Sequence, residues 1–218
     1  MGKKGFIFDL DGVIVDTAKY HYLAWKKLAN ELGFGFTEEQ NELFKGVSRK
    51  RCLEILLDIG GVKATQEQFD AWMAGKNEDY LAYIDKMDAS EVLPDVVKVL
   101  KSLKDREVPI ALGSASKNAK PILERVGLLH YFDCLVDGNS VTKAKPDPEV
   151  FLIAAQKLGL KPGDCIVFED AVAGIQAANS AKMTSIGIGD PVVLADADYN
   201  FNDFTEIDLG FIKELLES

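Results

Sequence analysis

Short, densely apolar runs recur along the chain, and stretches with helical spacing of apolar residues separate most of them. The runs are "GFIFDL", "VPIALGSA", "DCLVDG", "DCIVFED" and "TSIGIG". They hold too many apolar residues for strands with one face in water, so they predict an α/β fold with a buried, Rossmann-like parallel sheet and helices on both faces. Crossover helices are expected at residues 95–106, 117–126, 147–158 and 171–181. Gly127 and Gly159 follow two of these helices as stop signals.

The first interval between strands breaks this rhythm, because far more residues lie between Asp11 and Val108 than one crossover needs. Within it, apolar residues recur at helical spacing: Trp25, Leu28, Ala29 and Leu32, then Leu53, Leu56 and Leu57, then Phe69, Trp72 and Met73. The pattern predicts a small α-helical cap domain inserted into the core. The expected boundaries are 1–16 and 89–218 for the core domain and 17–88 for the cap domain. The chain crosses between them near 12–16 and 86–93, and such paired crossings can act as a hinge.

Composition and charge narrow the classes of function. The chain has 218 residues, 47% of them hydrophobic, and a formal net charge of −10, which disfavours a nucleic-acid surface or an anionic membrane as partner. Cys52, Cys134 and Cys165 are an odd count without metal-type spacing, so buried thiols in a reducing compartment are expected, with no disulfide framework and no zinc site. Without a long apolar run or a signal-like start, the expected location is the cytoplasm. A monomer is the default for one core and one cap.

The run "FIFDLDGVIVDT" ends a buried strand in two carboxylates. Asp9 and Asp11 are two positions apart, so in extended chain they project to the same side, at the sheet edge where open α/β folds hold ligands. Close carboxylates repel each other unless a proton or a cation lies between them, and Mg²⁺ is a suitable hard cation. The alternative is a strand end with solvated aspartates that help a turn at Gly12.

A second acidic pair weakens that alternative. The segment "CIVFEDAVAGI" again ends an apolar strand in carboxylates, Glu169 and Asp170, directly before a helix. Asp170 alone could be a helix N-cap, but an N-cap does not explain Glu169. Carboxylates gathered at one sheet edge are strongly unfavourable without a cation, so a shared Mg²⁺ accounts for both pairs.

Two further strand ends supply positive charge and hydrogen-bond donors. In "ALGSASKNAKP" a strand runs into a helix start with Pro121 in or near its first turn. Hydroxyl, main-chain and amide donors suited to a phosphate come from Ser114, Ala115, Ser116 and Asn118. A serine-capped helix is the plainer alternative. In "KAKPDPEVF", Pro146 favours an extended geometry for Lys145, whereas Lys143 is expected at the surface.

The segments "DLDGVIVDT", "GSASKN", "AKPDP" and "FEDAVAGI" fall in this order at four successive sheet edges. With this combination the chain resembles the haloacid dehalogenase (HAD) superfamily of phosphotransferases along its whole length. The resemblance implies that Asp9 is the nucleophile that accepts a phosphoryl group and that Asp11 is the general acid and base. It also implies that Ser114 and Lys145 hold the transferring phosphate. The implied ligands of Mg²⁺ are Asp9, the Asp11 carbonyl, Glu169 and Asp170.

The predicted cap domain carries its own cations. The segment "FKGVSRKRC" places Lys45 and Arg49 around Gly46 and Ser48, between two helical segments. Main-chain N–H groups and a forked guanidinium there could hold a distant phosphate. The alternative is a helix start with scattered surface cations.

Lys76 lies four residues after Trp72 and four before Tyr80, in a stripe that is otherwise expected to be buried or to face a ligand. His21 is ambiguous, because one histidine beside two tyrosines is more often packed or capped than catalytic.

The segments "DLDGVIVDTAKYHYLAWKKLA", "KGVSR" and "GSASKN" are similar to the β-phosphoglucomutase branch of this superfamily. That branch interconverts β-glucose 1-phosphate and glucose 6-phosphate through an aspartyl phosphate and glucose 1,6-bisphosphate. The expected substrate-binding residues are Thr17, His21, Trp25, Lys45, Gly46, Val47, Arg49, Lys76, Ala115, Ser116, Lys117 and Asn118. The partner implied is a small sugar phosphate.

Two other functions stay open at this point. A sugar-phosphate phosphatase of the same fold would share Asp9, Asp11, Lys145 and the metal ligands, and differs in admitting water. A catalytically silent sensor of sugar phosphates is the third, although it has no use for a nucleophile beside a proton donor. The amounts of glucose 6-phosphate and free phosphate formed from β-glucose 1-phosphate separate the three.

Overall fold

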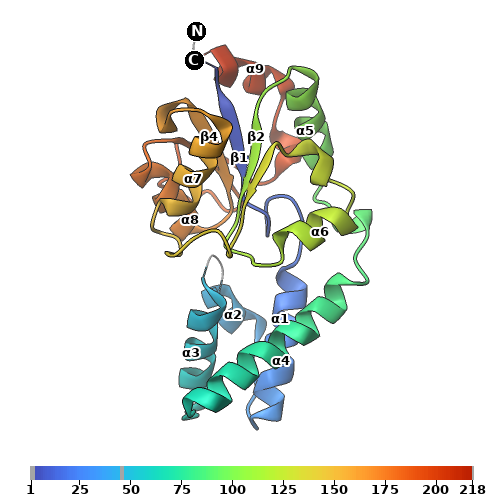
Figure 1. Cartoon of the computed structure of the whole chain (residues 1–218), viewed down its shortest axis with the longest axis vertical. Coiled ribbons are helices and arrows are strands. Elements are labelled where there is room, and N and C mark those ends of the chain that lie inside the picture. Colours follow the sequence, from blue (N-terminus) through green and yellow to red (C-terminus); the bar gives the residue numbers. More distant parts are fainter. Residues whose placement is uncertain (1–2, 45–46, 218) are drawn as a thin grey trace.

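The computed structural model describes residues 3–44 and 47–217, as a larger α/β domain above a smaller helical domain (Figure 1). The larger domain is built on a six-stranded sheet in the order β3-β2-β1-β4-β5-β6, with every neighbouring pair parallel. The strands are β1 Gly5–Phe8, β2 Ile110–Gly113, β3 Cys134–Val136, β4 Cys165–Glu169, β5 Thr184–Ile188 and β6 Tyr199–Phe201. The predicted Rossmann-like parallel sheet is therefore confirmed, with β6 as an additional edge strand.

Helices cover both faces of this sheet. They are α5 Val96–Asp105, α6 Ala119–Arg125, α7 Glu149–Leu158, α8 Val172–Ser180 and α9 Leu209–Glu217. Each of the first four lies inside its predicted range. Gly127 and Gly159 take φ values of 75° and 71°, the left-handed conformation that glycine adopts without steric cost.

Alternation along β1 sends neighbouring side chains to opposite faces of the sheet. Phe6 and Phe8 pack into a cluster with α5, α6 and α9, and the Phe8 ring stacks on Phe168 with centroids 4.8 Å apart. Ile7 points the other way, into the cluster formed with α7 and α8. The central strands are thus buried on both faces, which explains their nearly continuous apolar sequence.

The smaller domain contains α1 Ala18–Glu31, α2 Glu38–Asn41, α3 Arg49–Gly60 and α4 Gln66–Ile84. It has its own hydrophobic cluster, to which all three predicted apolar stripes contribute. Trp25 lies at its centre, with its ring edge-on to Phe44 at 5.6 Å between centroids. Most of the buried apolar residues of the insert belong to this cluster, whereas Ala24 of α1 and Tyr80 and Ile84 of α4 belong to the core cluster that contains Phe6 and Phe8. Short 3₁₀ turns complete the chain: η1 Glu42–Phe44, η2 Ala89–Glu91, η3 Leu129–Tyr131, η4 Pro162–Asp164 and η5 Phe204–Glu206.

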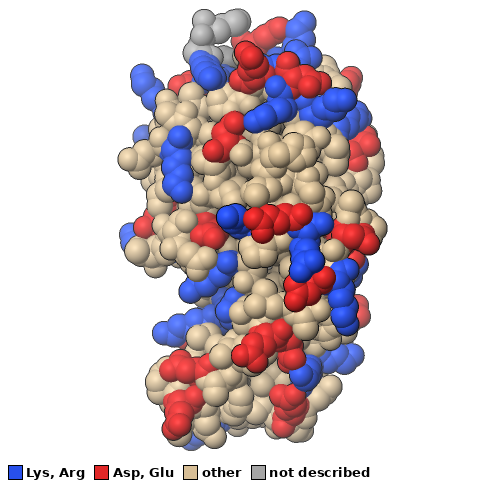
Figure 2. All heavy atoms as spheres, turned by 45° about the vertical axis from the view of Figure 1, so that its right-hand side comes forward, with Lys and Arg blue, Asp and Glu red and all other residues tan. Residues whose placement is uncertain are grey.

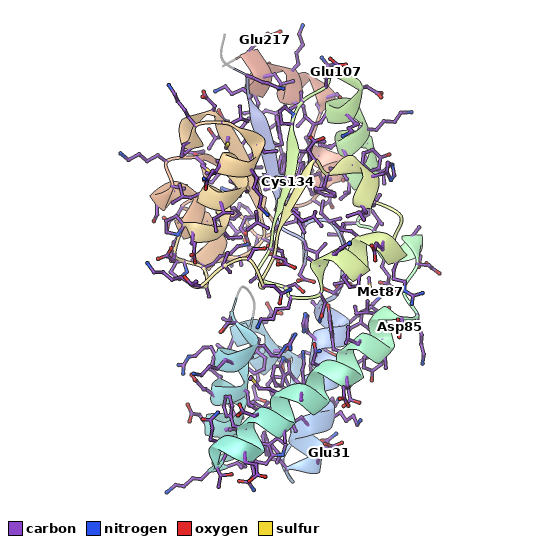
Figure 3. The ribbon with its side chains drawn as sticks, viewed as in Figure 1. Glu31, Asp85, Met87, Glu107, Cys134 and Glu217 are labelled. Atoms are coloured by element: carbon purple, nitrogen blue, oxygen red, sulfur yellow. The ribbon has the colours of Figure 1, made fainter. Side chains whose placement is uncertain are left out.

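Two segments join the domains, and they are hydrogen-bonded to each other. The Leu93 N–H donates to the Ile14 carbonyl at 3.0 Å, and the Asp16 N–H donates to the Glu91 carbonyl at 3.1 Å. The Tyr20 hydroxyl donates to the Glu91 carboxylate at 2.5 Å. The two predicted crossings therefore lie side by side and are joined by main-chain hydrogen bonds. Figure 3 shows Met87 and Asp85 where α4 leads back to the core.

Charges are interspersed on the face that Figure 2 displays, with Lys and Arg beside Asp and Glu on both domains. All three cysteines are free thiols; Cys52 and Cys165 are buried and Cys134 is partly buried. Within residues 3–44 and 47–217, the structure contains no helix with the length and apolar character needed to cross a membrane.

Candidate active site

The carboxyl ends of the central strands bring the predicted core residues together. Asp9 directly follows β1, and its N–H donates to the Phe168 carbonyl of β4 at 2.9 Å. Glu169 is the last residue of β4, and Ser114 directly follows β2. Asp9, Ser114 and Glu169 are all buried. Parallel register places these ends side by side, so residues far apart in sequence meet at one edge.

Lys145 lies between two of these carboxylates. Its Nζ donates to Asp9 Oδ1 at 2.6 Å and to Glu169 Oε2 at 2.7 Å. The side chains of Lys145 and Glu169 are only 2% and 1% exposed. Burial alone would lower the pKa of Lys145, but the charges of Asp9 and Glu169 outweigh it and raise the pKa above the usual value. Lys145 therefore stays cationic, whereas exposed Lys143 lies at the surface as predicted.

A third carboxylate completes the cluster, because oxygens of Asp9, Glu169 and Asp170 lie within 4.8 Å of one another. Two glycines make room for it. A Cβ on Gly12, whose φ is +80°, would collide with the Asp170 carboxylate, and a Cβ on Gly174 would collide with that of Glu169. The solvated-turn alternative is therefore wrong for buried Asp9, and the N-cap position of α8 belongs to Ala171 rather than Asp170.

One lysine does not balance this cluster. Burial and the nearby Asp9 raise the pKa of Glu169 to about 7, against the opposing effect of Lys145. The close donors are all carboxylate oxygens, the ligands that hard divalent cations prefer. The residues present therefore fit a divalent cation held by Asp9, Glu169 and Asp170, whose charge would offset the uncompensated carboxylates.

Asp11 has a different environment from Asp9. Its carboxylate accepts a short hydrogen bond from the buried Thr17 hydroxyl. Burial and the charge of Asp9 raise the pKa of Asp11 to about 7, against the opposing effects of Lys145 and Lys76. A carboxyl with such a raised pKa can hold a proton near neutral pH, as a general acid must, whereas Asp9 is held in its ion pair with Lys145.

The donors predicted after β2 form an ordered loop. The Ser116 N–H donates to Ser114 Oγ at 3.1 Å, and the Asn118 N–H donates to Ser116 Oγ at 3.3 Å. Asn118 is the N-cap residue of α6, and Pro121 lies in its first turn, as predicted. Ala115 and Ser116 are partly buried, whereas Lys117 is exposed. We call residues 114–118 the phosphate loop.

On the cap side, Lys76 is buried and forms no ion pair with a carboxylate of residues 3–44 and 47–217. Its Nζ lies 2.9 Å from His21 Nδ1, and it sits over the rings of Trp25 and Tyr80 at 4.5 Å and 4.9 Å from their centroids. Burial and the positive charge of Arg49 lower the pKa of Lys76 to about 7. In the stripe that was expected to be buried or to face a ligand, Lys76 and Tyr80 are buried and Trp72 is partly buried.

His21 stacks on Tyr80, with ring centroids 4.1 Å apart. Burial, Lys76 and Arg49 lower the pKa of His21 well below its usual value, so the imidazole is neutral and Nδ1 can accept from Lys76. His21 is therefore packed, as the sequence pattern favoured. We call His21, Trp25, Lys76 and Tyr80 the Lys76 cluster.

Arg49 opens α3 and is partly buried, and burial lowers the pKa of its guanidinium. Val47 packs against the hydrophobic cluster of the smaller domain, which favours a structural role for this residue. Ser48 caps α3 by accepting from the Arg51 N–H at 3.4 Å. Lys45 and Gly46, the remaining predicted residues of this loop, lie outside the described residues.

Sequence reasoning missed three residues that shape the site. Tyr80 entered only through its spacing from Lys76, although it contacts both His21 and Lys76. Gly174 gave a signal that was not used, namely a glycine one helical turn beyond an acidic pair. Asn77 gave none, because its partner Asn118 belongs to the other domain.

Comparisons with known proteins agree with this geometry. The family model described as haloacid dehalogenase-like hydrolase matches residues 3–182. The chain is 40% identical over 213 residues to "Beta-phosphoglucomutase" of Bacillus subtilis (strain 168), covering 97% of this chain and 94% of that protein. It is 33% identical over 186 residues to "Fructose-1-phosphate phosphatase YqaB" of Escherichia coli (strain K12), covering 84% and 95%. The crystal structure of beta-phosphoglucomutase from Clostridium difficile superposes with a TM-score of 0.93 at 38% identity, covering 99% and 98% of the two chains.

Proposed function

The chain belongs to the haloacid dehalogenase-like hydrolase family, and we propose that within this family it is a β-phosphoglucomutase. It interconverts β-D-glucose 1-phosphate and D-glucose 6-phosphate through an aspartyl phosphate and glucose 1,6-bisphosphate. The observation that carries the proposal is the ion pair of Asp9 with Lys145 in a buried acidic cluster, together with the Lys76 cluster of the cap, which holds a second buried lysine. The B. subtilis relative and the C. difficile structure support the same assignment.

Asp9 is the proposed nucleophile. One of its oxygens forms a bond to phosphorus while the bond from phosphorus to the sugar oxygen breaks, and the electron pair of that bond leaves with the sugar oxygen. Negative charge approaches negative charge in this step, so Lys145, fixed 2.6 Å from Asp9, would neutralise phosphate oxygens together with Ser114. Mg²⁺ bound by Asp9, the Asp11 carbonyl, Glu169 and Asp170 would supply further positive charge at the phosphate.

Asp11 is the proposed general acid and base. Its raised pKa, about 7, lets the carboxyl donate a proton to the departing sugar oxygen. The resulting carboxylate then takes a proton from the hydroxyl that attacks the aspartyl phosphate. Thr17, which donates to Asp11, would orient the carboxyl for both transfers.

The cap domain, residues 17–88, is proposed to select the sugar phosphate and exclude water. Arg49 is partly buried, and no described carboxylate pairs with it in an ion pair, so its guanidinium is available to a distal phosphate. Two aromatic rings and an imidazole contact Lys76, and no carboxylate of the described residues forms an ion pair with it. Closure of this cap around a sugar phosphate would let the aspartyl phosphate react with a sugar hydroxyl rather than with water.

One assay tests the proposal. The protein is supplied with β-glucose 1-phosphate, Mg²⁺ and a trace of glucose 1,6-bisphosphate, and glucose 6-phosphate and free phosphate are measured side by side. Dominant glucose 6-phosphate is expected. Dominant free phosphate would instead identify a sugar-phosphate phosphatase, the function named for the E. coli relative, and the absence of both products would favour a sensor.

A further inference from the structure

Helix α4 of the cap and helix α6 of the core meet through two side-chain pairs. Asn118 Nδ2 donates to Asn77 Oδ1 at 3.1 Å, beside the phosphate loop. Arg125 contacts Asp85 at 2.7 Å, near the linker, where Figure 3 shows Asp85 at the core end of α4. The two contacts are about two helical turns apart on each helix, so one lies at the site and the other at its outer margin.

The Asn118 side chain does not cap α6, although Asn118 occupies the N-cap position of this helix. Asparagine is among the preferred N-cap residues because its side chain accepts from a main-chain N–H of the first turn. At α6 the Asn118 side chain makes no such bond, whereas the side chains of Thr37, Ser48 and Thr65 cap their helices in the smaller domain. The amide of Asn118 instead reaches across the domain boundary to Asn77.

This contact continues into the phosphate loop. The Asn118 N–H donates to Ser116 Oγ, and the Ser116 N–H donates to Ser114 Oγ. A chain of hydrogen bonds therefore runs from α4 of the cap to Ser114, beside the buried acidic cluster. Asn77 directly follows Lys76 of the Lys76 cluster. Two consecutive residues of α4 therefore contact different parts of the site, because Lys76 contacts His21 of the cap and Asn77 contacts Asn118 of the phosphate loop.

We propose that Asn77 is a positioning residue that couples the placement of the cap to the shape of the phosphate loop. The inference rests on the proposed mutase function. When α4 lies against α6, Asn77 holds the Asn118 amide, and through it the loop, in the geometry that receives a phosphate. Without Asn77 the loop is no longer ordered by cap closure, so water reaches the aspartyl phosphate more often. The effect falls on the partition of the phosphoryl group between sugar and water and on KM, while the bond-breaking step at Asp9 is left intact.

The test compares Asn77→Ala with the parent protein in the two-product assay. One neutral hydrogen bond predicts a fall of about two- to tenfold in the ratio of glucose 6-phosphate to free phosphate. Asp85→Asn is the matched control, because it breaks the exposed contact of the same two helices away from the loop, and it is expected to keep the parent ratio. The inference would be overturned if Asn77→Ala kept the product ratio of the parent, or if the ratio fell equally in Asn77→Ala and Asp85→Asn.

A double-mutant cycle separates positioning from a merely structural role. If Asn77 acts through Asn118, adding Asn77→Ala to Asn118→Ala changes the ratio no further. The same fall in both backgrounds would assign Asn77 to the stability of α4 alone, and thermal unfolding of the four proteins would reveal such a loss. Failure of the mutase proposal looks different, because the parent protein itself would then release mainly free phosphate.

Discussion

Two buried lysines face the site from opposite domains, and their surroundings differ. Lys145 of the core touches two carboxylates, at 2.6 Å and 2.7 Å, and they raise its pKa. Lys76 of the cap touches an imidazole and lies over two aromatic rings, and burial and Arg49 lower its pKa to about 7. The same residue type is therefore stabilised as a cation in the core and destabilised as a cation in the cap.

We relate this difference to two proposed roles, catalysis in the core and recognition of the ligand in the cap. In the core, positive charge is balanced before any substrate arrives, so the reacting groups are fixed in advance. In the cap, buried Lys76 and partly buried Arg49 form no ion pair with a described carboxylate, so an arriving phosphate would gain the interaction that these two cations lack. The core is organised for one reaction, and the cap is organised to respond to one class of ligand.

The largest expected effect comes from removing Asp9, the proposed nucleophile of the core. Asp9→Asn leaves an amide that cannot form the acyl phosphate, so turnover is expected to fall by at least about 10⁴-fold. The measurement is formation of glucose 6-phosphate and of free phosphate. Asp16→Asn, the same change at the exposed third aspartate of the motif, is the control and should retain turnover. Equal activity of Asp9→Asn and the parent would refute the mechanism.

The next effect concerns the balance of charge in the core. Lys145→Met leaves the buried carboxylates of Asp9 and Glu169 without their cation, so the free energy of unfolding is expected to fall by about 3 to 5 kcal/mol. Urea unfolding at pH 7 without divalent cations measures it. Lys143→Met, at a lysine 68% exposed, is the control and should change the free energy little. Similar values for both variants would mean that Lys145 does not stabilise the buried carboxylates.

A smaller effect is expected from Arg49 of the cap, which forms no ion pair with a carboxylate that the structure describes. Arg49→Ala removes the guanidinium proposed to hold the distal phosphate, so KM for the sugar phosphate should rise by about 10- to 100-fold with a smaller change in kcat. Steady-state kinetics measure both constants. Arg51→Ala is the control, because Arg51 is exposed and pairs with Glu54 at 2.9 Å. A fall in kcat alone would assign Arg49 to the chemical step instead.

The two domains also differ in how far the sequence predicts them. In the core, a strand end fixes where the next residue lies, so Asp9, Ser114 and Glu169 could be placed at one edge from the apolar runs alone. The apolar runs did not predict strand β6, because its sequence "YNF" is short and only partly apolar. Helix α9 is amphipathic, with Ile212 and Leu215 buried, but no motif drew attention to it.

In the cap, helical spacing predicts which residues are buried but not what surrounds them. The spacing of Lys76 from Trp72 and Tyr80 marked it as unusual, yet its contacts come from His21 and Trp25 on α1. Such contacts depend on how two helices pack, which the pattern within one helix does not specify. The bond from Asn77 to Asn118 depends on the placement of two domains, one step further from the sequence.

The smallest effect tests whether Lys76 is destabilised as a cation. Between its pKa of about 7 and the ordinary value of 10.5, the unfolded chain binds more protons at this residue than the folded protein does. The free energy of unfolding therefore rises with pH in this window through Lys76. Lys76→Met has no such titration, so its stability relative to the parent should be highest near pH 7 and decline toward pH 10.

The ring contacts of Trp25 and Tyr80 favour the ammonium and oppose this penalty, so the expected change across the window is on the order of 1 kcal/mol. Urea unfolding of both proteins at several pH values measures it. Lys26→Met is the matched control, because Lys26 lies over the Tyr22 ring at 5.1 Å but is exposed, and its difference from the parent should not vary with pH between 7 and 10. If the difference in free energy of unfolding between Lys76→Met and the parent did not change with pH, the rings and the imidazole would stabilise the cation as fully as water does. The two buried lysines would then differ in their contacts but not in the stability of their charged form.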